Sequence, residues 1–365
     1  MRPALIIGGG PAGATTAALL AGSGRRVTLV ERAPEPTDKV CGDFLSTEAI
    51  ALARTLGVDP ATLGAEPITH VRLAHGHTLA EAALPFPALG FSRRRFDAAL
   101  LQAAEDRGAT VLRGHAVQRI RRDRDSVVAQ LQRHPDLRAG TVFLATGKHD
   151  LRGHPRPGRG EGPVGVKFAL RLAPGQHRQL CGAVELVLFP GGYAGLQVIE
   201  HGQAVLCLLA DRHRLPVRSG SAQDWIEALR GACPHLAQRL GGADAGPARP
   251  LTIAGLPFGY RRPARATSPQ LYPVGDQIAV IPSLSGDGVA LAMHSGAAAA
   301  HAWLGGIPPA EHARAFGARI GRQMHLASAI HAACLSGAGQ DMLARAVRRW
   351  PGLLRVAANW TRLVV

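Results

Sequence analysis

The chain has 365 residues, 46% of them hydrophobic and 19% charged, which is enough to bury a large core and excludes a disordered protein. Its five cysteines are dispersed and lack the spacing of a zinc site, so we predict a reduced compartment and no metal. The formal net charge is +16, but aromatic residues make up only 4% and no recognition helix is apparent, so we predict no nucleic-acid partner.

The excess of arginine leaves three interpretations open. It is typical of a solvated basic surface, of a surface attracted to an anionic membrane or an acidic carrier protein, or of a site for an anionic substrate. Met1 leads almost directly into an apolar run, which predicts no signal peptide, and the longest apolar stretch is unsuited to a membrane span. The expected location is cytoplasmic, with peripheral attachment to the inner membrane face as an alternative.

The first 32 residues predict a dinucleotide-binding βαβ unit. A strand at 4–8 precedes a turn with glycine at positions 8, 10 and 13, followed by a helix over 12–21 and a strand over 27–30. Gly8 suits a tight turn, Gly10 a close approach to a pyrophosphate, and Gly13 close helix–strand packing. Glu31 follows the second strand, where a carboxylate can accept hydrogen bonds from ribose hydroxyls.

The next stretch alternates helices and strands. A helix is predicted at 47–56, and Ser92 caps a second helix at 93–107 whose buried face carries Phe96 and Leu100. Two short strands within 68–88 are expected to leave the nucleotide domain, and further strands are expected at 110–113, 116–121, 127–131 and 141–145.

A Gly- and Pro-rich loop at 148–162 then leads into a β-rich segment. Its strands are predicted at 164–172, 183–189, 193–200 and 203–210, in an antiparallel sheet covered by a helix at 222–232. A strand ending in Gly275 and Asp276 and a Ser/Gly loop precede a small-residue helix that ends near Leu304. Helices are expected at 309–333 and 340–363, with Pro351 breaking the last one.

Four separated motifs together resemble FAD-dependent oxidoreductases of the aromatic hydroxylase (p-hydroxybenzoate hydroxylase-like) fold, in the branch of geranylgeranyl reductases and flavin monooxygenases. The motifs are the glycine turn with Glu31 and Arg32, the segment Cys41-Gly42-Asp43, the pair Arg93 and Phe96-Asp97, and Gly275-Asp276 followed by Gly286-Asp287-Gly288. The implied fold class is α/β with an α+β insert: a Rossmann-like FAD-binding domain, a β-sheet substrate domain and a helical C-terminus.

This resemblance implies a division of the chain into three parts. Residues 1–66, 89–162 and 264–335 would form a discontinuous FAD-binding domain. Residues 67–88 and 163–263 would form the substrate domain, and 336–365 a C-terminal helical segment. The implied FAD-binding residues are Gly8, Gly10, Pro11, Ala12, Gly13, Glu31, Arg32, Cys41, Gly42, Arg93, Val117, Ala145, Thr146, Gly147, Gly275, Asp276, Gly286, Gly288 and Val289.

For catalysis the resemblance indicates only cavity-lining candidates, Cys41 and Tyr193. Cys41 would either face the substrate or be an inert buried thiol. Two departures matter. Gly195 stands where the reductases usually carry a tryptophan, which implies a wider or altered cavity and argues against isoprenoid reduction. Ala145-Thr146-Gly147 lacks the Asp-Gly of many single-component hydroxylases, which argues against direct NADPH use. The electron donor is therefore expected to be either NAD(P)H, bound transiently, or a separate reductase.

We therefore expect an FAD-dependent enzyme, with a monooxygenase favoured over a double-bond reductase of the geranylgeranyl reductase type. A flavin halogenase and a non-catalytic electron carrier are minor alternatives. The expected substrate is a lipophilic aromatic, polyketide or isoprenoid-like small molecule, free or bound to a carrier protein. The C-terminal segment carries tryptophans among arginines, which suits a helix that packs on its own domain or one that lies on a membrane surface.

Overall fold

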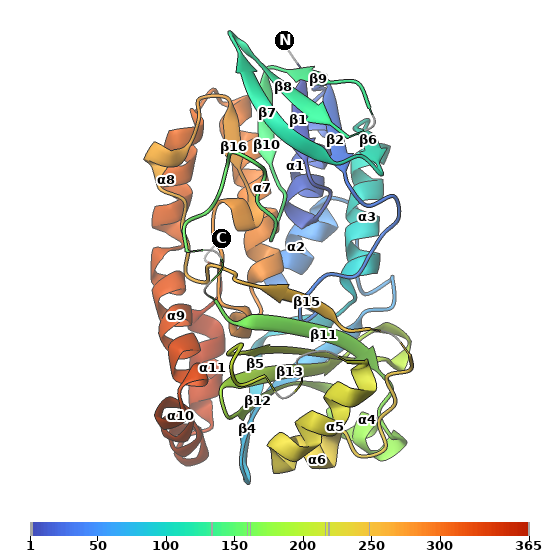
Figure 1. Ribbon diagram of the computed structural model, residues 1–365, viewed down its shortest axis with the longest axis vertical. Coiled ribbons are helices and arrows are strands. Elements are labelled where there is room, and N and C mark those ends of the chain that lie inside the picture. The colour runs from blue at the N-terminus through green and yellow to red at the C-terminus, as the bar shows by residue number, and fades with distance from the viewer. Residues whose placement is uncertain are drawn as a thin grey trace.

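The computed structural model describes residues 3–363 except for positions 133, 159, 161, 216, 218, 219 and 248. Two positions of the predicted 148–162 loop and the last two residues of the C-terminal segment thus lie outside the described residues. A parallel sheet and a larger mixed sheet occupy the two ends of the molecule, and the C-terminal helices run along one side (Figure 1).

The predicted βαβ unit is confirmed at the centre of the parallel sheet. The strand order is β16-β10-β1-β2-β6, and every neighbouring pair is parallel. These strands are β1 (Ala4–Ile7), β2 (Val27–Glu31), β6 (Thr110–Arg113), β10 (Thr141–Leu144) and β16 (Leu271–Pro273). All four residues of β1 are buried, as expected for a strand covered on both faces.

Small residues allow the helices to pack closely on one face of this sheet. The helices are α1 (Pro11–Gly22), α2 (Thr47–Thr55), α3 (Arg93–Asp106) and α7 (Gly288–Leu304). A Cβ atom at Gly296 of α7 would clash with the carbonyl oxygen of Ala12, so glycine is required where α7 crosses α1. The side chain of Ser92 caps α3, and Phe96 and Leu100 are fully buried, as predicted.

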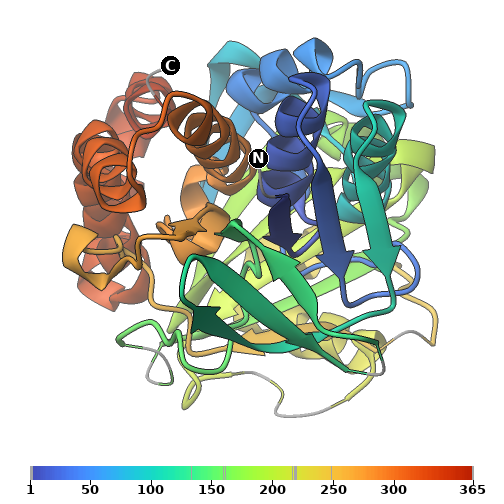
Figure 2. The same cartoon turned by 90° about the horizontal axis from the view of Figure 1, so that it is seen from above.

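The other face of the parallel sheet is covered by a three-stranded sheet of β7 (Val117–Asp123), β8 (Ser126–Leu131) and β9 (Leu137–Ala139) (Figure 2). The three-residue β9 had not been predicted. Its pairing with β8, rather than a local pattern, defines it as a strand.

The second sheet has eight strands in the order β15-β11-β14-β13-β12-β4-β5-β3. They are β3 (Phe44–Leu45), β4 (Glu66–His75), β5 (Thr78–Gly90), β11 (Val164–Leu170), β12 (Gly182–Phe189), β13 (Gly192–Val198), β14 (Ala204–Ala210) and β15 (Leu251–Ala254). The predicted antiparallel pairing holds for β11 to β14, but β12 and β4 pair in parallel. The residue boundaries of the three predicted parts of the chain stay a prediction.

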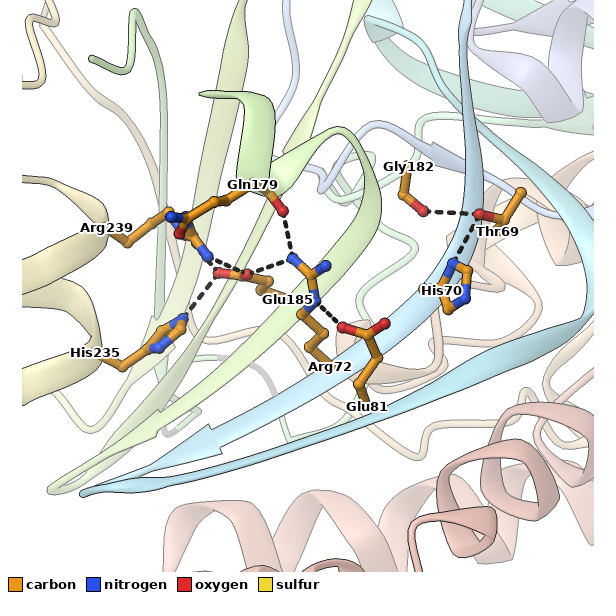
Figure 3. A network of polar contacts seen from close by, with 9 residues as sticks. All are labelled: Thr69, His70, Arg72, Glu81, Gln179, Gly182, Glu185, His235 and Arg239. Carbon is orange, nitrogen blue, oxygen red and sulfur yellow. Dashed lines mark hydrogen bonds and ion pairs between the residues drawn. The ribbon is translucent and has the colours of Figure 1, made fainter. Parts of the chain in front are cut away.

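Helices α4 (Pro174–Leu180), α5 (Ala222–Ala232) and α6 (Pro234–Arg239) cover one face of the second sheet. The covering helix at 222–232 is confirmed, whereas α4 and α6 are short and had not been predicted. A polar network fastens α6 to the strands (Figure 3). In it, Glu185 of β12 is fully buried between Arg239, at 2.8 Å, and Arg72, at 3.1 Å.

The C-terminal region forms four helices, one more than the predicted segments with their break at Pro351: α8 (Pro309–Arg319), α9 (Gly321–Leu335), α10 (Gly337–Arg349) and α11 (Gly352–Trp360). Ser336 is extended and its side chain accepts a hydrogen bond from the backbone N–H of Gly339, which starts α10 as a separate helix. Pro351 separates α10 from α11, as predicted. Short 3-10 helices occupy Glu200–Gly202, Ala264–Ala266, Gly275–Gln277 and Ser283–Ser285.

Candidate active site

A cavity of about 630 Å³ lies where the two sheets and the C-terminal helices meet. Its wall includes Gly10 after β1, Gly147 after β10 and Asp276 after β16. These residues follow the carboxyl ends of parallel strands, where open α/β sheets bind their ligands. The same wall continues across the second sheet to α11, so one space connects the glycine turn with the far end of the molecule.

The three glycines of the first turn have separate roles. Gly8 has a φ of 109°, and a Cβ atom there would clash with the carbonyl oxygen of Ala145. A Cβ atom at Gly13 would clash with the carbonyl oxygen of Gly8. At Gly10 it would face the cavity and meet only the guanidinium of Arg93, at 3.7 Å. Gly8 and Gly13 are therefore required by packing, and Gly10 leaves the backbone open to a ligand.

Two charged side chains flank this turn. Glu31 accepts hydrogen bonds from the backbone N–H groups of Gly9, at 2.6 Å, and Ala33, at 3.0 Å. Arg93 lines the cavity beside Gly10, and two hydrogen bonds of 2.7 and 2.8 Å to Asp97 fix its guanidinium. A planar cation held next to the N-terminus of α1 is well placed for a diphosphate.

Cys41 and Gly42 line the cavity, and the next residue, Asp43, anchors this segment to the second sheet. Asp43 is fully buried with a φ of 57°, and its carboxylate lies 2.6 Å from Nζ of Lys167 on β11. Burial raises the pKa of Asp43 to about 6, although Lys167 opposes the shift. The carbonyl oxygen of Asp43 also accepts a hydrogen bond of 2.7 Å from the side chain of Gln197. The second sheet thus fixes the loop that presents Cys41 to the cavity.

A similar anchor holds the turn at Gly286, Asp287 and Gly288. Gly286 is left-handed, with a φ of 65°, and a Cβ atom there would lie 2.9 Å from the ring of Phe44. The fully buried carboxylate of Asp287 accepts hydrogen bonds from Gln323, at 2.6 Å, and from the backbone N–H of Leu363, at 2.8 Å.

Arg362 completes this anchor, with its guanidinium 3.2 Å from the Asp287 carboxylate. Burial raises the pKa of Asp287 to about 6, with Arg362 acting in the opposite direction. The end of the chain is therefore tied to the start of α7. The sequence motif included Asp287, but no local sequence pattern predicts its contacts with the distant residues Gln323 and Arg362.

Polar groups are sparse on the side of the cavity formed by the second sheet. The buried hydroxyl of Tyr193 lies 2.9 Å from Oγ of Ser283 and 3.3 Å from Nδ1 of His331. Burial raises the pKa of Tyr193, raises that of Cys207 to about 12 and lowers that of His331 to about 4. Tyr193 and Cys207 are therefore protonated, and His331 is neutral, at neutral pH.

The apolar part of the wall is contributed by both sheets and by the C-terminal helices. It includes Val71, Leu73, Leu84, Phe86, Leu186, Leu209, Ile253, Phe258, Leu326, Ile330, Leu343, Val347, Leu353, Leu354, Val356 and Trp360. Glu185 reaches the wall, but His235, Arg72 and Arg239 occupy its two carboxylate oxygens.

The structure gathers most of the predicted site residues around this cavity. Those that line it are Gly10, Pro11, Ala12, Cys41, Gly42, Arg93, Ala145, Gly147, Tyr193, Gly275, Asp276, Gly286, Gly288 and Val289. Gly8, Gly13, Glu31, Arg32, Val117 and Thr146 are not part of its wall. Lys148 lines the cavity and donates a hydrogen bond to the carbonyl oxygen of Val40, although the sequence analysis had not singled it out.

Four glycine-containing turns along the cavity leave room for an extended dinucleotide beside the backbone. Gly10, Gly42, Gly147 and Gly288 all line the cavity. Where a Cβ atom would stand at Gly42, Gly147 or Gly288, there is no described atom within 4 Å. The backbone is therefore uncovered at separate points along the cavity, from the start of α1 to the start of α7. Within the described residues no group of three or more His, Cys, Asp or Glu side chains is arranged to hold a metal.

The comparisons agree with this geometry. Residues 1–142 match the family described as FAD binding domain. Over 134 residues the chain is 31% identical to a menaquinone reductase of Mycobacterium tuberculosis H37Rv, which covers 35% of this chain and 32% of the relative. Over 120 residues it is 33% identical to the menaquinone reductase of Mycolicibacterium smegmatis, covering 31% and 29%. The matched region thus spans about a third of these relatives.

Solved structures match nearly the whole chain. A geranylgeranyl bacteriochlorophyll reductase-like protein from Thermoplasma acidophilum has a TM-score of 0.77 at 18% identity, covering 100% of this chain and 94% of that one. The flavin-dependent brominase Bmp2 also has a TM-score of 0.77, at 17% identity, with 99% and 93% covered.

A flavoprotein/dehydrogenase from Cytophaga hutchinsonii gives the same score at 16% identity, with 99% and 96% covered. The chain therefore has a fold that is also found in a geranylgeranyl bacteriochlorophyll reductase-like protein and in flavin-dependent halogenating enzymes. More particularly, its N-terminal part matches an FAD binding domain, so FAD is the cofactor that the comparisons indicate.

Proposed function

We propose that the protein is an FAD-dependent oxidoreductase that reduces a carbon–carbon double bond in a long apolar substrate of the isoprenoid type. The observation that carries the proposal is the cavity wall, which is mostly apolar on the side of the second sheet and the C-terminal helices as far as α11. The relatives named menaquinone reductases, of which about a third is matched, support a reductase.

In this proposal the chain holds FAD along the cavity. Gly10 and Arg93 would bind the diphosphate, Glu31 the adenosine ribose, and Asp276 the ribityl hydroxyls. The turn at Gly286 and Gly288 would face the flavin ring, where backbone N–H groups at the start of α7 stabilise negative charge. When bound and reduced, FAD supplies a hydride, and the chain has to exclude water and position the substrate.

Reduction of a double bond also requires a proton for the second carbon. Tyr193 can donate one from its hydroxyl, and a proton from solvent would restore it, relayed through the hydroxyl of Ser283, 2.9 Å away. Cys41, which also lines the cavity, is the alternative donor. NAD(P)H or a separate reductase would supply the electrons. We propose Tyr193 as the donor because its hydroxyl lies at the cavity wall and is held by two polar neighbours.

Hydroxylation by reduced flavin and dioxygen, which the sequence analysis favoured, is the second candidate. The same fold occurs in a flavin-dependent brominase and in FAD-dependent halogenases. Hydroxylation of a phenol benefits from a base that ionises the substrate. Among the described residues of the wall, Glu185 is occupied by its ion pairs and Asp276 is assigned to the ribityl chain. Among the described residues of the wall, neither carboxylate is therefore left to ionise a phenol, and this favours reduction over hydroxylation.

The two chemistries separate in an anaerobic single-turnover experiment. The FAD-loaded protein is reduced, mixed without oxygen with a geranylgeranyl compound that has no quinone ring, and followed by flavin absorbance and product mass. We expect reoxidation of the flavin together with a product two mass units heavier. Tyr193→Phe should slow this step by roughly 10²-fold, whereas Tyr260→Phe, outside the cavity wall, should not. Reoxidation only on addition of oxygen, with an oxygenated product, would replace the proposal by hydroxylation.

A further inference from the structure

Large apolar side chains are exposed together around α10 and α11. Met342 is 56% exposed, Trp350 59%, Leu353 40%, Val356 46% and Trp360 62%. Leu79, 51% exposed, lies near the tip of the β4–β5 hairpin, which is joined to α10 by a 3.0 Å contact between His75 and Asp341. Helices α10 and α11 lie at the end of the molecule opposite the β7–β8–β9 sheet (Figure 1). We call this surface the α10–α11 face.

The cavity opens on this face. Leu353, Val356 and Trp360 line the cavity and are also exposed to solvent, so they form its rim. Behind them the wall continues through Leu343 and Val347 towards Tyr193. A ligand that enters between these side chains stays in contact with apolar groups as it moves towards the predicted flavin site.

Arginines surround the rim. Arg345, Arg348, Arg349 and Arg355 are exposed on the same two helices. The guanidinium of Arg349 lies over the ring of Trp350, 5.3 Å from its centroid. Asp341 is the one acidic residue of α10 and α11, and it is engaged by His75. The face therefore combines exposed tryptophans with an excess of positive charge.

We propose that the α10–α11 face docks on an anionic phospholipid bilayer, so that a lipid substrate enters the cavity directly from the membrane. Tryptophan and leucine favour the headgroup boundary, and arginines favour anionic headgroups. The part that concerns substrate entry rests on the proposed function; the docking itself does not. No helix in the described part of the chain has the length and apolar character needed to cross a membrane.

The docking is tested by co-sedimentation of the FAD-loaded protein with vesicles. One set contains only phosphatidylcholine, and in the other a third of the lipid is phosphatidylglycerol. We expect binding to the second set, weakened by high salt. Replacing Arg348→Glu with Arg349→Glu should lower the vesicle partition coefficient at least tenfold, because each basic residue near the surface adds to the attraction. Trp350→Ala with Trp360→Ala should also weaken binding.

The matched control reverses two exposed arginines at the other end of the molecule, Arg122→Glu with Arg124→Glu, and should bind as the wild type does. The proposal would be overturned if the two double arginine variants lost vesicle binding equally, or if the wild type did not bind phosphatidylglycerol vesicles. A concentration-dependent dimer that the tryptophan replacements abolish would also overturn it, because it would show that a second copy covers the face.

A further measurement separates this inference from the proposed function. The Arg348→Glu, Arg349→Glu variant should reduce a short, water-soluble alkene analogue at the wild-type rate and a vesicle-borne substrate more slowly. Vesicle binding without reduction of either substrate would contradict the proposed function and leave docking standing. Reduction of the vesicle-borne substrate at an unchanged rate by this variant would contradict entry from the membrane.

Discussion

Arg93 shows how one residue can serve both the fold and the predicted cofactor. Its guanidinium faces the cavity beside Gly10, and Asp97 occupies its other side through two hydrogen bonds. The backbone N–H of Arg93 also lies 3.3 Å from the carboxylate of Asp43, which links α3 to the loop that carries Cys41.

Replacing Arg93 by alanine should weaken FAD binding. Loss of a charge-assisted hydrogen bond to a phosphate costs about 1.5–3 kcal/mol, or roughly 10- to 100-fold in affinity. A fluorescence titration of the apoprotein with FAD measures this change. Arg94→Ala, which removes the adjacent exposed arginine of the same helix, should leave the affinity unchanged. Equal affinities for the two variants would remove Arg93 from the FAD site.

Glu185 provides a prediction on pH. Burial alone would raise the pKa of Glu185, but hydrogen bonds from His235 and Arg239 outweigh it and lower the pKa from 4.5 to about 2. The folded state therefore favours the ionised form. Its contribution to stability is present above pH 4.5 and is lost as the pH falls towards 2.

Glu185→Gln should lower the free energy of unfolding at pH 7 by about 3–5 kcal/mol, because Arg239 and Arg72 lose a buried partner. The variant should also lose part of the acid sensitivity between pH 4.5 and pH 2. Denaturant unfolding at several pH values measures both. Glu81→Gln, which removes the exposed partner of Arg72, serves as the control and should cost less than about 1 kcal/mol. An equal effect of the two substitutions would contradict the role given to burial.

At the scale of elements, the C-terminal helices are attached to the turn at Gly286 and Gly288 by the last described residues. Arg362 pairs with Asp287, donates to the carbonyl oxygen of Ser285, and lies over the ring of Phe86 at 4.9 Å. Because α11 forms the rim of the cavity, this tether connects the rim with the start of α7.

Arg362→Ala should destabilise the protein by about 3–5 kcal/mol, since the buried carboxylate of Asp287 loses its ion pair. Amide hydrogen exchange should rise in α11 more than in α5, which belongs to a different cluster of the core. Arg355→Ala, an exposed change on α11, should affect neither quantity. Uniform exchange across α5 and α11 in the Arg362 variant would show that the tether has no local role.

Elements with strong local signals could be predicted from the sequence. The unit from β1 to β2, the capped helix α3, the helix α5 and the strands β11 to β14 all follow from periodicity, glycine turns and caps. The strands β9 and β15 and the helices α4 and α6 could not, because each has three to seven residues and is defined by tertiary contacts. The parallel pairing of β12 with β4 joins residues more than a hundred positions apart, which no local pattern specifies.

The site divides in the same way. Residues within glycine motifs, such as Gly10 and Gly286, could be singled out because a left-handed turn or a close approach to the backbone requires glycine. Lys148, Ser283, His331 and Arg362 could not, because their places depend on how distant segments pack. Tyr193 was found only through the resemblance to known reductases.

At the scale of the whole molecule, the cavity is a joint product of the two sheets and the C-terminal helices. The parallel sheet contributes the glycine turns, the mixed sheet fixes the Cys41 loop through Lys167, and α11 forms the rim. In the function that we propose, a long apolar substrate would enter the cavity at this rim. At the glycine turn, Gly8 and Gly13 are required by backbone packing, whereas Gly10 leaves the backbone open to the cavity.

The most direct test compares Gly10→Ala with the wild type, measuring FAD affinity and the unfolding free energy of the apoprotein. A Cβ atom at Gly10 has room in the protein alone, so the unfolding free energy should change by less than about 1 kcal/mol. The added methyl group would occupy the space assigned to the diphosphate, so FAD affinity should fall at least about tenfold, or 1.4 kcal/mol. Unchanged FAD affinity in a folded Gly10→Ala protein would contradict the account.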